Sequence, residues 1–236
     1  MDCRSGKVLH VQFHFVLIWV LFLTPISAYG ADRSPTFFAT AGGGFYSHES
    51  DFVASKDTGY SFDYAVGVFT GADKNLSMQI RSSTIDTTFD LNESKSTLEF
   101  QETMFDYYWG PVYLGLGLAQ TKTVITRQTE TAIDIDAIGT GFAGAVGGAF
   151  EFGRSSKFYF DISSVTISSV KEVNKSEFTI GSRLDATMGG SFAITRSLLV
   201  GYAAVTYRTL SFALSGTSGN ELIMMTHFGL GANLNF

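Results

Sequence analysis

The sequence is poor in the residues that hold together small secreted domains or metal sites. Cys3 is the only cysteine among 236 residues, so neither a disulfide framework nor thiol chemistry is available. Beyond the N-terminal apolar run only His48 and His227 remain, and two distant histidines without cysteine make no recognisable set of metal ligands. The sequence therefore predicts no metal and no other cofactor.

Proline and helical patterning are equally scarce. Pro25, Pro35 and Pro111 are the only prolines, and all three fall outside the interiors of the expected strands. No sustained apolar stripe at i, i+3, i+4 with capping residues follows Asp32. The formal net charge is −6, and no basic stripe interleaved with aromatic residues offers a nucleic-acid surface. These absences favour an all-β chain that does not bind nucleic acid.

The first thirty residues have the parts of a secretory signal peptide. Arg4 and Lys7 give a positive start, residues 13–23 are apolar, and small residues suited to cleavage lie between Ala28 and Ala31. A transmembrane anchor is the alternative, but the apolar run is shorter than the roughly 20 residues that a spanning helix needs. We expect residues 1–30 to be removed and residues 31–236 to form one domain.

The rest of the chain alternates between apolar and small or polar side chains, which predicts strands with two different faces. In residues 60–69, for example, Tyr60, Phe62 and Tyr64 oppose Ser61 and Asp63. Ten such segments occur, and longer polar connections alternate with short turns. The longer connections are expected at residues 47–59, 87–96, 127–137, 171–176 and 211–220. This layout predicts an antiparallel up-and-down transmembrane β-barrel of ten strands, with eight as the alternative.

The last segment, residues 222–236, alternates in the same way and ends on its apolar face. It resembles the closing strand of bacterial outer-membrane β-barrels, which commonly ends in Phe and carries an assembly signal. Gly231, Leu234 and Phe236 match that signal, whereas Gly229 stands where a polar residue is expected. The resemblance implies a Gram-negative outer-membrane protein with both termini in the periplasm. It also implies contact with outer-membrane lipid and lipopolysaccharide and with the barrel-assembly machinery, while the oligomeric state stays open.

In a barrel that crosses lipid, charged side chains are expected on the strand positions that face the lumen and not on those that face lipid. Every backbone N–H and C=O needs a partner within the protein, so a sheet crosses hydrocarbon only when it closes on itself. A Lys or Arg facing lipid at mid-depth would cost about 2–4 kcal/mol. The residues predicted to line the lumen are therefore His227 and the charged set Asp63, Arg81, Glu99, Glu151, Asp161, Arg183 and Asp185. They form either an ion-pair network that fills the barrel, which we favour because small barrels are largely filled, or a catalytic or ion-selective site.

The segment 97–109 is harder to orient. Leu98 and Phe100 point to the apolar face, but the same parity also carries Glu102 and Asp106 there. Either a β-bulge shifts the register near Glu102, or these acids lie beyond the apolar band. An aromatic cluster that precedes the turn at Gly110 predicts an interfacial girdle made of Phe105, Tyr107, Tyr108 and Trp109.

For function, the sequence favours a non-enzymatic barrel, either a narrow porin-like channel or a structural and surface-interaction protein. Glycine and alanine on the inward face of residues 139–149 are expected to leave volume unfilled. One alternative is a hydrolase: His48 and Ser50 have the His-x-Ser spacing that resembles lipid A deacylases, although they are expected in a loop. Omptin proteases also have ten strands, but the Asp-His dipeptide expected of them is absent. An adhesin or receptor acting through its loops is the remaining alternative.

Overall fold

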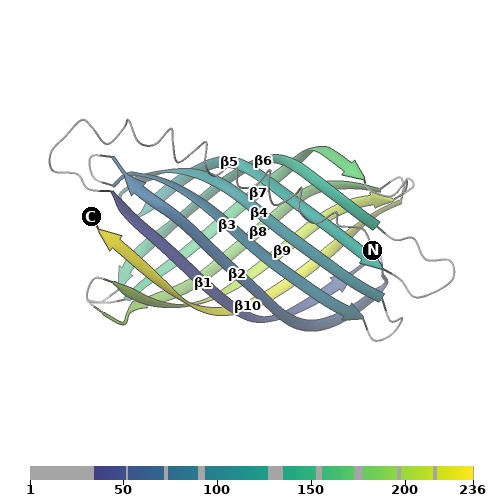
Figure 1. Cartoon of the computed structure of the whole chain (residues 1–236), viewed down its shortest axis with the longest axis horizontal. Coiled ribbons are helices and arrows are strands. Elements are labelled where there is room, and N and C mark those ends of the chain that lie inside the picture. The colour runs from purple at the N-terminus through teal and green to yellow at the C-terminus, as the bar shows by residue number, and fades with distance from the viewer. Residues whose placement is uncertain are drawn as a thin grey trace, which may run out of the picture. The chain divides into compact units, whose positions relative to one another are not determined.

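The structure, a computed structural model, describes residues 35–51, 53–71, 74–89, 94–126, 135–152, 156–172, 178–195, 198–214 and 217–235. The predicted signal peptide and Phe236 lie outside these residues. Ten antiparallel strands close into a barrel (Figure 1), which confirms the ten-strand prediction over the eight-strand alternative. The strands are β1 (Thr36–Ser50), β2 (Ser55–Thr70), β3 (Leu76–Phe89), β4 (Ser94–Trp109), β5 (Val112–Thr126), β6 (Ile135–Phe152), β7 (Ser156–Glu172), β8 (Phe178–Ala193), β9 (Leu199–Leu214) and β10 (Thr217–Asn235).

Closure is made by β1 and β10, which pair along the whole of β1. Thr36 lies opposite Asn235 at one end of this ladder, and Ser50 lies opposite Glu221 at the other. Each of the ten strands therefore pairs with two neighbours, and the closed sheet has no open edge. Gly231, from the predicted assembly signal, pairs with Thr40, whereas the side chain of Leu234 is not among those described.

The predicted alternation of long and short connections is wrong. β1 ends at Ser50 and β2 begins at Ser55, while β9 ends at Leu214 and β10 begins at Thr217. Most of the residues expected in the loops 47–59 and 211–220 thus belong to paired strands. Their polarity suggested loops, but a ladder is held by backbone hydrogen bonds and accepts polar side chains wherever the outer face meets water.

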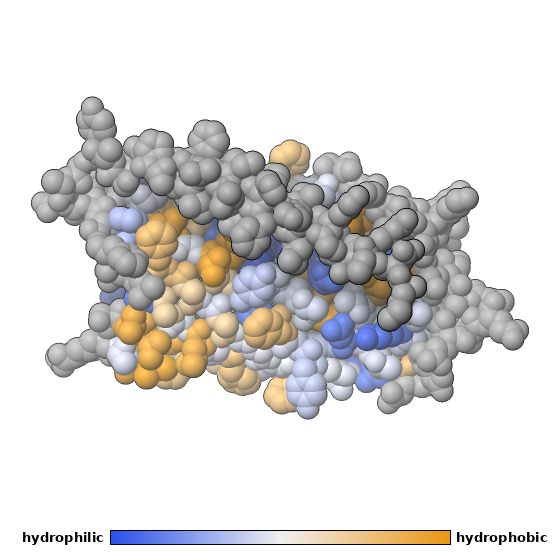
Figure 2. Space-filling view, in the orientation of Figure 1, coloured by the Kyte–Doolittle hydropathy of each residue, from blue (hydrophilic) through white to orange (hydrophobic). Residues whose placement is uncertain are grey.

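The strands are consequently longer than a bilayer requires. They run from 14 residues in β3 to 19 in β10, whereas about 9–11 tilted residues cross a membrane. In Figure 2 apolar side chains gather toward the end that carries the C-terminus, and hydrophilic ones lie toward the opposite end. We call the part near Thr36 and Asn235 the inner half and the part near the β1–β2 connection the outer half.

The two halves have opposite polarity. In the inner half the outward side chains are apolar, among them Leu116 and Phe142, which are 73% and 66% exposed. On β4 in the outer half the apolar side chains point inward: Leu98 is fully buried, and its neighbour Glu99 forms an ion pair with Lys122 on the outer surface, whereas Phe45 of β1 and Tyr60 of β2 are exposed. A single strand therefore changes its apolar face from inside to outside along its length.

This reversal corrects the orientation predicted for β4. The ladder between β3 and β4 runs without a register shift from Leu76 opposite Tyr107 to Phe89 opposite Ser94. No bulge is present near Glu102, and Glu102 and Asp106 are buried inside the barrel rather than beyond an apolar band. Leu98 and Phe100 were expected to face lipid, but both are buried in the interior. Among the described residues, no helix is long and apolar enough to span a membrane.

Candidate functional site

The interior of the outer half is filled by a hydrophobic cluster, which we call the outer plug. Its side chains come from strands all around the barrel and are at most 6% exposed. They are Tyr46, Val53, Ile85, Phe89, Leu98, Phe100, Ile125, Ile135, Ala137, Ile180, Leu210, Phe212, Ile223 and Met225. Because close-packed apolar side chains leave no room for water, the plug closes the lumen at this level.

A small polar cluster is enclosed within the outer half. His48 contacts Glu221 through Nε2 and Thr87 Oγ1 through Nδ1 at 2.8 Å, while the Ser50 hydroxyl donates to Glu221 Oε1 at 2.8 Å. His48 lies on the inward face of β1, not in the loop that the sequence suggested. Ser50 bonds the carboxylate of Glu221 rather than the imidazole, and both residues are almost fully buried. Nucleophilic catalysis needs a serine in contact with its base, and these two residues do not meet that requirement.

On the inner side of the plug lies a set of buried ion pairs, which we call the ion layer. Arg208 binds Asp185 through two bonds of 2.9 Å and donates to Ser83 Oγ at 2.9 Å. Arg183 pairs with Glu102 and lies 3.4 Å from Asp185. Both guanidinium groups lie over the ring of Phe100, at 4.1 Å for Arg208 and 5.1 Å for Arg183. The layer links β4, β8 and β9 across the lumen and compensates charges that would be costly to bury alone.

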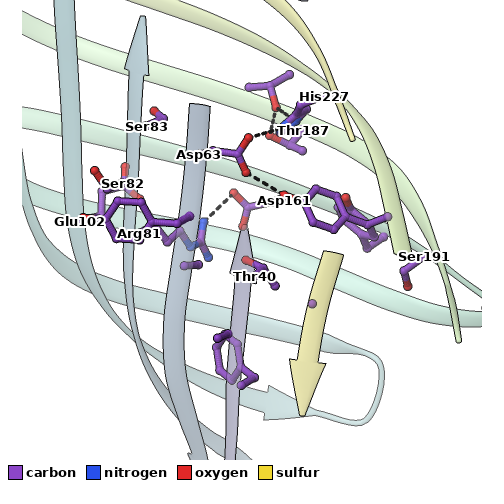
Figure 3. Close-up of a pocket in the computed structure, with 18 of the residues that line it drawn as sticks. Thr40, Asp63, Arg81, Ser82, Ser83, Glu102, Asp161, Thr187, Ser191 and His227 are labelled. Atoms are coloured by element: carbon purple, nitrogen blue, oxygen red, sulfur yellow. Dashed lines mark hydrogen bonds and ion pairs between the residues drawn. The ribbon is translucent and has the colours of Figure 1, made fainter. Parts of the chain in front are cut away.

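On the inner side of the ion layer is a cavity of about 440 Å³, shown in Figure 3. Arg208 and Phe100 line its outer side, and the lining continues to Phe69, Val200 and Asn233 near the inner end of the barrel. The cavity therefore extends toward the inner end of the barrel, while the plug closes the outer end. Its size falls within the range of about 300–1,000 Å³ that is usual for small-molecule sites.

Two groups of polar side chains face this cavity. In the first, Asp63 accepts a 2.8 Å hydrogen bond from Tyr202 and lies 3.3 Å from His227 Nδ1. In the second, Arg81 contacts Asp161 at 3.4 Å. Figure 3 shows Asp63 directed toward His227 and Arg81 directed toward Asp161. The ring nitrogen Nε2 of His227 is also 3.1 Å from the hydroxyl of Thr206.

The structure brings together most of the residues that were predicted to line the lumen. Those found inside the barrel are Asp63, Arg81, Asp161, Arg183, Asp185 and His227. Two predictions are wrong. Glu99 lies on the outer surface with Lys122, and Glu151 is 77% exposed in its side chain and pairs with Lys157 near the end of the β6–β7 hairpin. Glu99 was misplaced because its parity was counted from Leu98, which faces inward.

Sequence reasoning missed several interior polar residues. Arg208 was not among the residues predicted to line the lumen, and the alternation counted from Leu98 carried Glu102 and Asp106 to the apolar face. Counting by twos from Trp109, which is 54% exposed next to a tight turn, would have placed both acids inside. Asp106 accepts hydrogen bonds from Ser77 at 2.8 Å and Gln79 at 2.6 Å. The terminal aromatic of β4 was therefore a safer reference than the leucine near its outer end.

The predicted aromatic girdle is divided between the two faces of β4. Phe105, Tyr107 and Trp109 are exposed outside, and the rings of Tyr107 and Trp109 meet edge to face at 4.6 Å. Tyr108 instead packs inside the barrel against Tyr113 at 5.1 Å and Phe69 at 5.7 Å. Tyr107, Tyr108 and Trp109 are consecutive and cannot all share one face of a strand, because successive side chains alternate.

The small residues of β6 do not leave open space opposite them. Ala143 and Ala145 are buried with Met104 and Val165 in a second hydrophobic cluster. The larger side chains of neighbouring strands thus occupy the volume that β6 leaves free. Among the described residues, no group of three or more His, Cys, Asp or Glu side chains could hold a metal ion.

Comparison with known proteins finds similarity at the level of structure. No family model and no curated protein matches the chain. Neisserial surface protein A is 12% identical with a TM-score of 0.41, over 83% of this chain and 96% of that one. The outer-membrane protease OmpT from Escherichia coli is 9% identical with a TM-score of 0.43, over 87% and 97%. The β-domain of the Bordetella autotransporter BrkA is 13% identical with a TM-score of 0.44, over 87% and 100%.

The chain resembles the bacterial outer-membrane β-barrels. This likeness concerns the fold and assigns no activity: by their names, one of these barrels is a protease, one is a surface protein and one is the β-domain of an autotransporter. The chemistry open to this barrel therefore depends on its plug, its ion layer and its cavity.

Proposed function

We propose that this chain is a non-enzymatic outer-membrane protein whose outer half projects from the membrane as a closed, water-exposed cylinder. Both termini lie on the periplasmic side, and the role of the barrel is structural and surface-presenting rather than that of a passive channel. The reversal of polarity between the two halves carries this proposal.

The reversal has a simple physical reason. Burial of an apolar side chain inside a cylinder is favourable when water surrounds the cylinder, at about 25 cal/mol per Å² of apolar surface removed from water. In hydrocarbon the same burial brings little gain, and outward ions such as Glu99 and Lys122 would be costly. An outer half with Leu98 inside and Glu99 outside is thus suited to water, while an inner half with Leu116 outside is suited to lipid.

Accessibility of single cysteines on intact cells tests this arrangement. Cys3 is the only natural cysteine, so a cysteine introduced in the barrel can be followed with a membrane-impermeant maleimide. We expect Glu99→Cys to react on intact cells and Leu116→Cys to remain unreactive in the membrane. Lys157→Cys, near the inner end, should react only after the outer membrane is permeabilised. An unreactive Glu99→Cys, or a Lys157→Cys that reacts on intact cells, would contradict the proposal.

Conductance measurements address the channel alternative. The outer plug fills the lumen with residues that are at most 6% exposed, so we expect no stepwise current above background in a planar bilayer. A reproducible single-channel conductance from the folded protein would reject the closed barrel. The hydrolase alternative has less support, because Ser50 bonds Glu221 and is 1% exposed.

A further inference from the structure

The lumenal cavity has an unequal balance of charge. Four carboxylates and three guanidinium groups line it or belong to the ion layer above it: Asp63, Glu102, Asp161 and Asp185, with Arg81, Arg183 and Arg208. The difference between four and three leaves one negative charge when His227 is neutral. Asp161, Asp185 and Glu102 each form an ion pair with an arginine. Asp63 is the one of these four carboxylates that pairs with no arginine; it lies 3.3 Å from His227 Nδ1 and accepts a hydrogen bond from Tyr202.

Asp63 is held in place by an arrangement that extends over several strands. Tyr202 belongs to β9, yet its hydroxyl reaches Asp63 on β2 at 2.8 Å by passing over β10 and β1. Gly42 and Gly229, which are paired with each other in the sheet, leave the space for this ring. A Cβ at Gly42 would lie 2.2 Å from the Tyr202 hydroxyl, and one at Gly229 would lie 2.4 Å from the ring. The two glycines thus permit the tyrosine to lie flat over the wall and orient the carboxylate.

The surroundings of Asp63 are aromatic as well as acidic. Tyr202 and His227 meet edge to face at 6.3 Å, and Tyr159 and Phe38 line the same cavity. A cation is attracted both by a carboxylate and by the faces of aromatic rings, and this combination is used to recognise organic ammonium groups. An anion would meet surplus negative charge, and the arginines that could attract it are already paired.

We infer that the cavity is a binding site for a small organic cation of the ammonium class, with Asp63 as the counter-charge. The cation enters from the inner end of the barrel, because the lining extends to Asn233 and the plug closes the outer end. Tyr202, Tyr159 and Phe38 surround the apolar part of the ligand. This inference does not depend on the location of the outer half relative to the membrane.

Calorimetric titration of the purified, folded barrel in non-ionic detergent tests the inference with a matched pair of probes. Choline carries a quaternary ammonium group, and 3,3-dimethyl-1-butanol has the same shape without the charge. We expect saturable binding of one choline per barrel and binding of the neutral alcohol that is weaker by about tenfold or more, since a desolvated cation–π contact with a counter-charge is worth about 1.4 kcal/mol or more. Absence of choline binding, or equal binding of the two probes, would overturn the inference using the wild-type protein alone.

Two variants then locate the site. Asp63→Asn keeps the shape of the side chain and removes its charge, and it should weaken choline binding by about tenfold or more with little effect on the neutral alcohol. Glu99→Gln removes a carboxylate from the outer surface and should leave choline binding unchanged. The migration of unheated samples on a detergent gel verifies that both variants are folded. Unchanged choline binding in a folded Asp63→Asn protein would reject the assignment of Asp63.

Discussion

Leu98 and Glu99 are consecutive residues of β4, yet Leu98 is fully buried in the outer plug while Glu99 forms a 2.7 Å ion pair with Lys122 outside the barrel. Eight and ten residues beyond Glu99 on the same strand, Tyr107 and Trp109 are exposed on the face that Glu99 occupies. The apolar face of this strand is therefore the inward one at Leu98 and the outward one at Trp109.

Truncation of Leu98 should reveal the contribution of the outer plug. We expect Leu98→Ala to lower the free energy of unfolding by about 2–5 kcal/mol, because it removes buried methyl groups and leaves a cavity. Leu116→Ala is the matched control on the inner half, where the side chain is 73% exposed and leaves no internal cavity. Denaturant unfolding of both variants in detergent measures the difference. Equal losses would contradict the existence of a packed outer interior.

Removal of Arg183 should be costly, and the cost should depend on its partner. Arg183→Met leaves Glu102 buried without its cation, and we expect a loss of about 3–5 kcal/mol in stability. Asp185 keeps Arg208 as a partner, so the main imbalance is at Glu102. Combining Arg183→Met with Glu102→Gln should therefore recover part of the loss. A double variant as unstable as the sum of the single ones would argue against a direct pair.

Gly42 should tolerate no side chain. A Cβ there would approach the backbone oxygen of Phe228 to 2.7 Å and the Tyr202 hydroxyl to 2.2 Å, so either the β1–β10 ladder or the tyrosine must move. We expect Gly42→Ala to reduce the yield of folded barrel and the stability of what folds. Gly144→Ala is the control, because nothing lies within 4 Å of the corresponding Cβ. Comparable stability of the two alanine variants would show that the space over Gly42 is not restrictive.

Phe236 remains a predicted assembly residue, since it lies outside the described part of the chain. Deletion of Phe236 should reduce insertion into the outer membrane, whereas Phe236→Trp should preserve it because an aromatic terminus is retained. The amount of heat-modifiable protein in the outer-membrane fraction measures insertion. Normal assembly of the deletion variant would show that the terminal aromatic is not the signal.

The lumenal residues show which inward-facing side chains could be predicted from alternation in the sequence. Asp63 and Arg81 were placed inside because, in their own segments, the apolar residues of the alternating pattern face outward. Glu99 was misplaced because its neighbours Leu98 and Phe100 are apolar for a different reason: they fill the plug. An alternating pattern identifies two faces, but it does not say which face is the inner one.

The sequence by itself predicted an antiparallel barrel of ten strands, with eight as the alternative, because side-chain alternation and turn residues are local properties of the chain. Only the tertiary structure decided the lengths of the strands, the reversal of polarity and the partners of each interior charge. Asp63 and Tyr202 are separated by 139 positions and meet because closure leaves only β1 and β10 between β2 and β9. Such contacts depend on the register and the circumference of the closed sheet, which no local pattern contains.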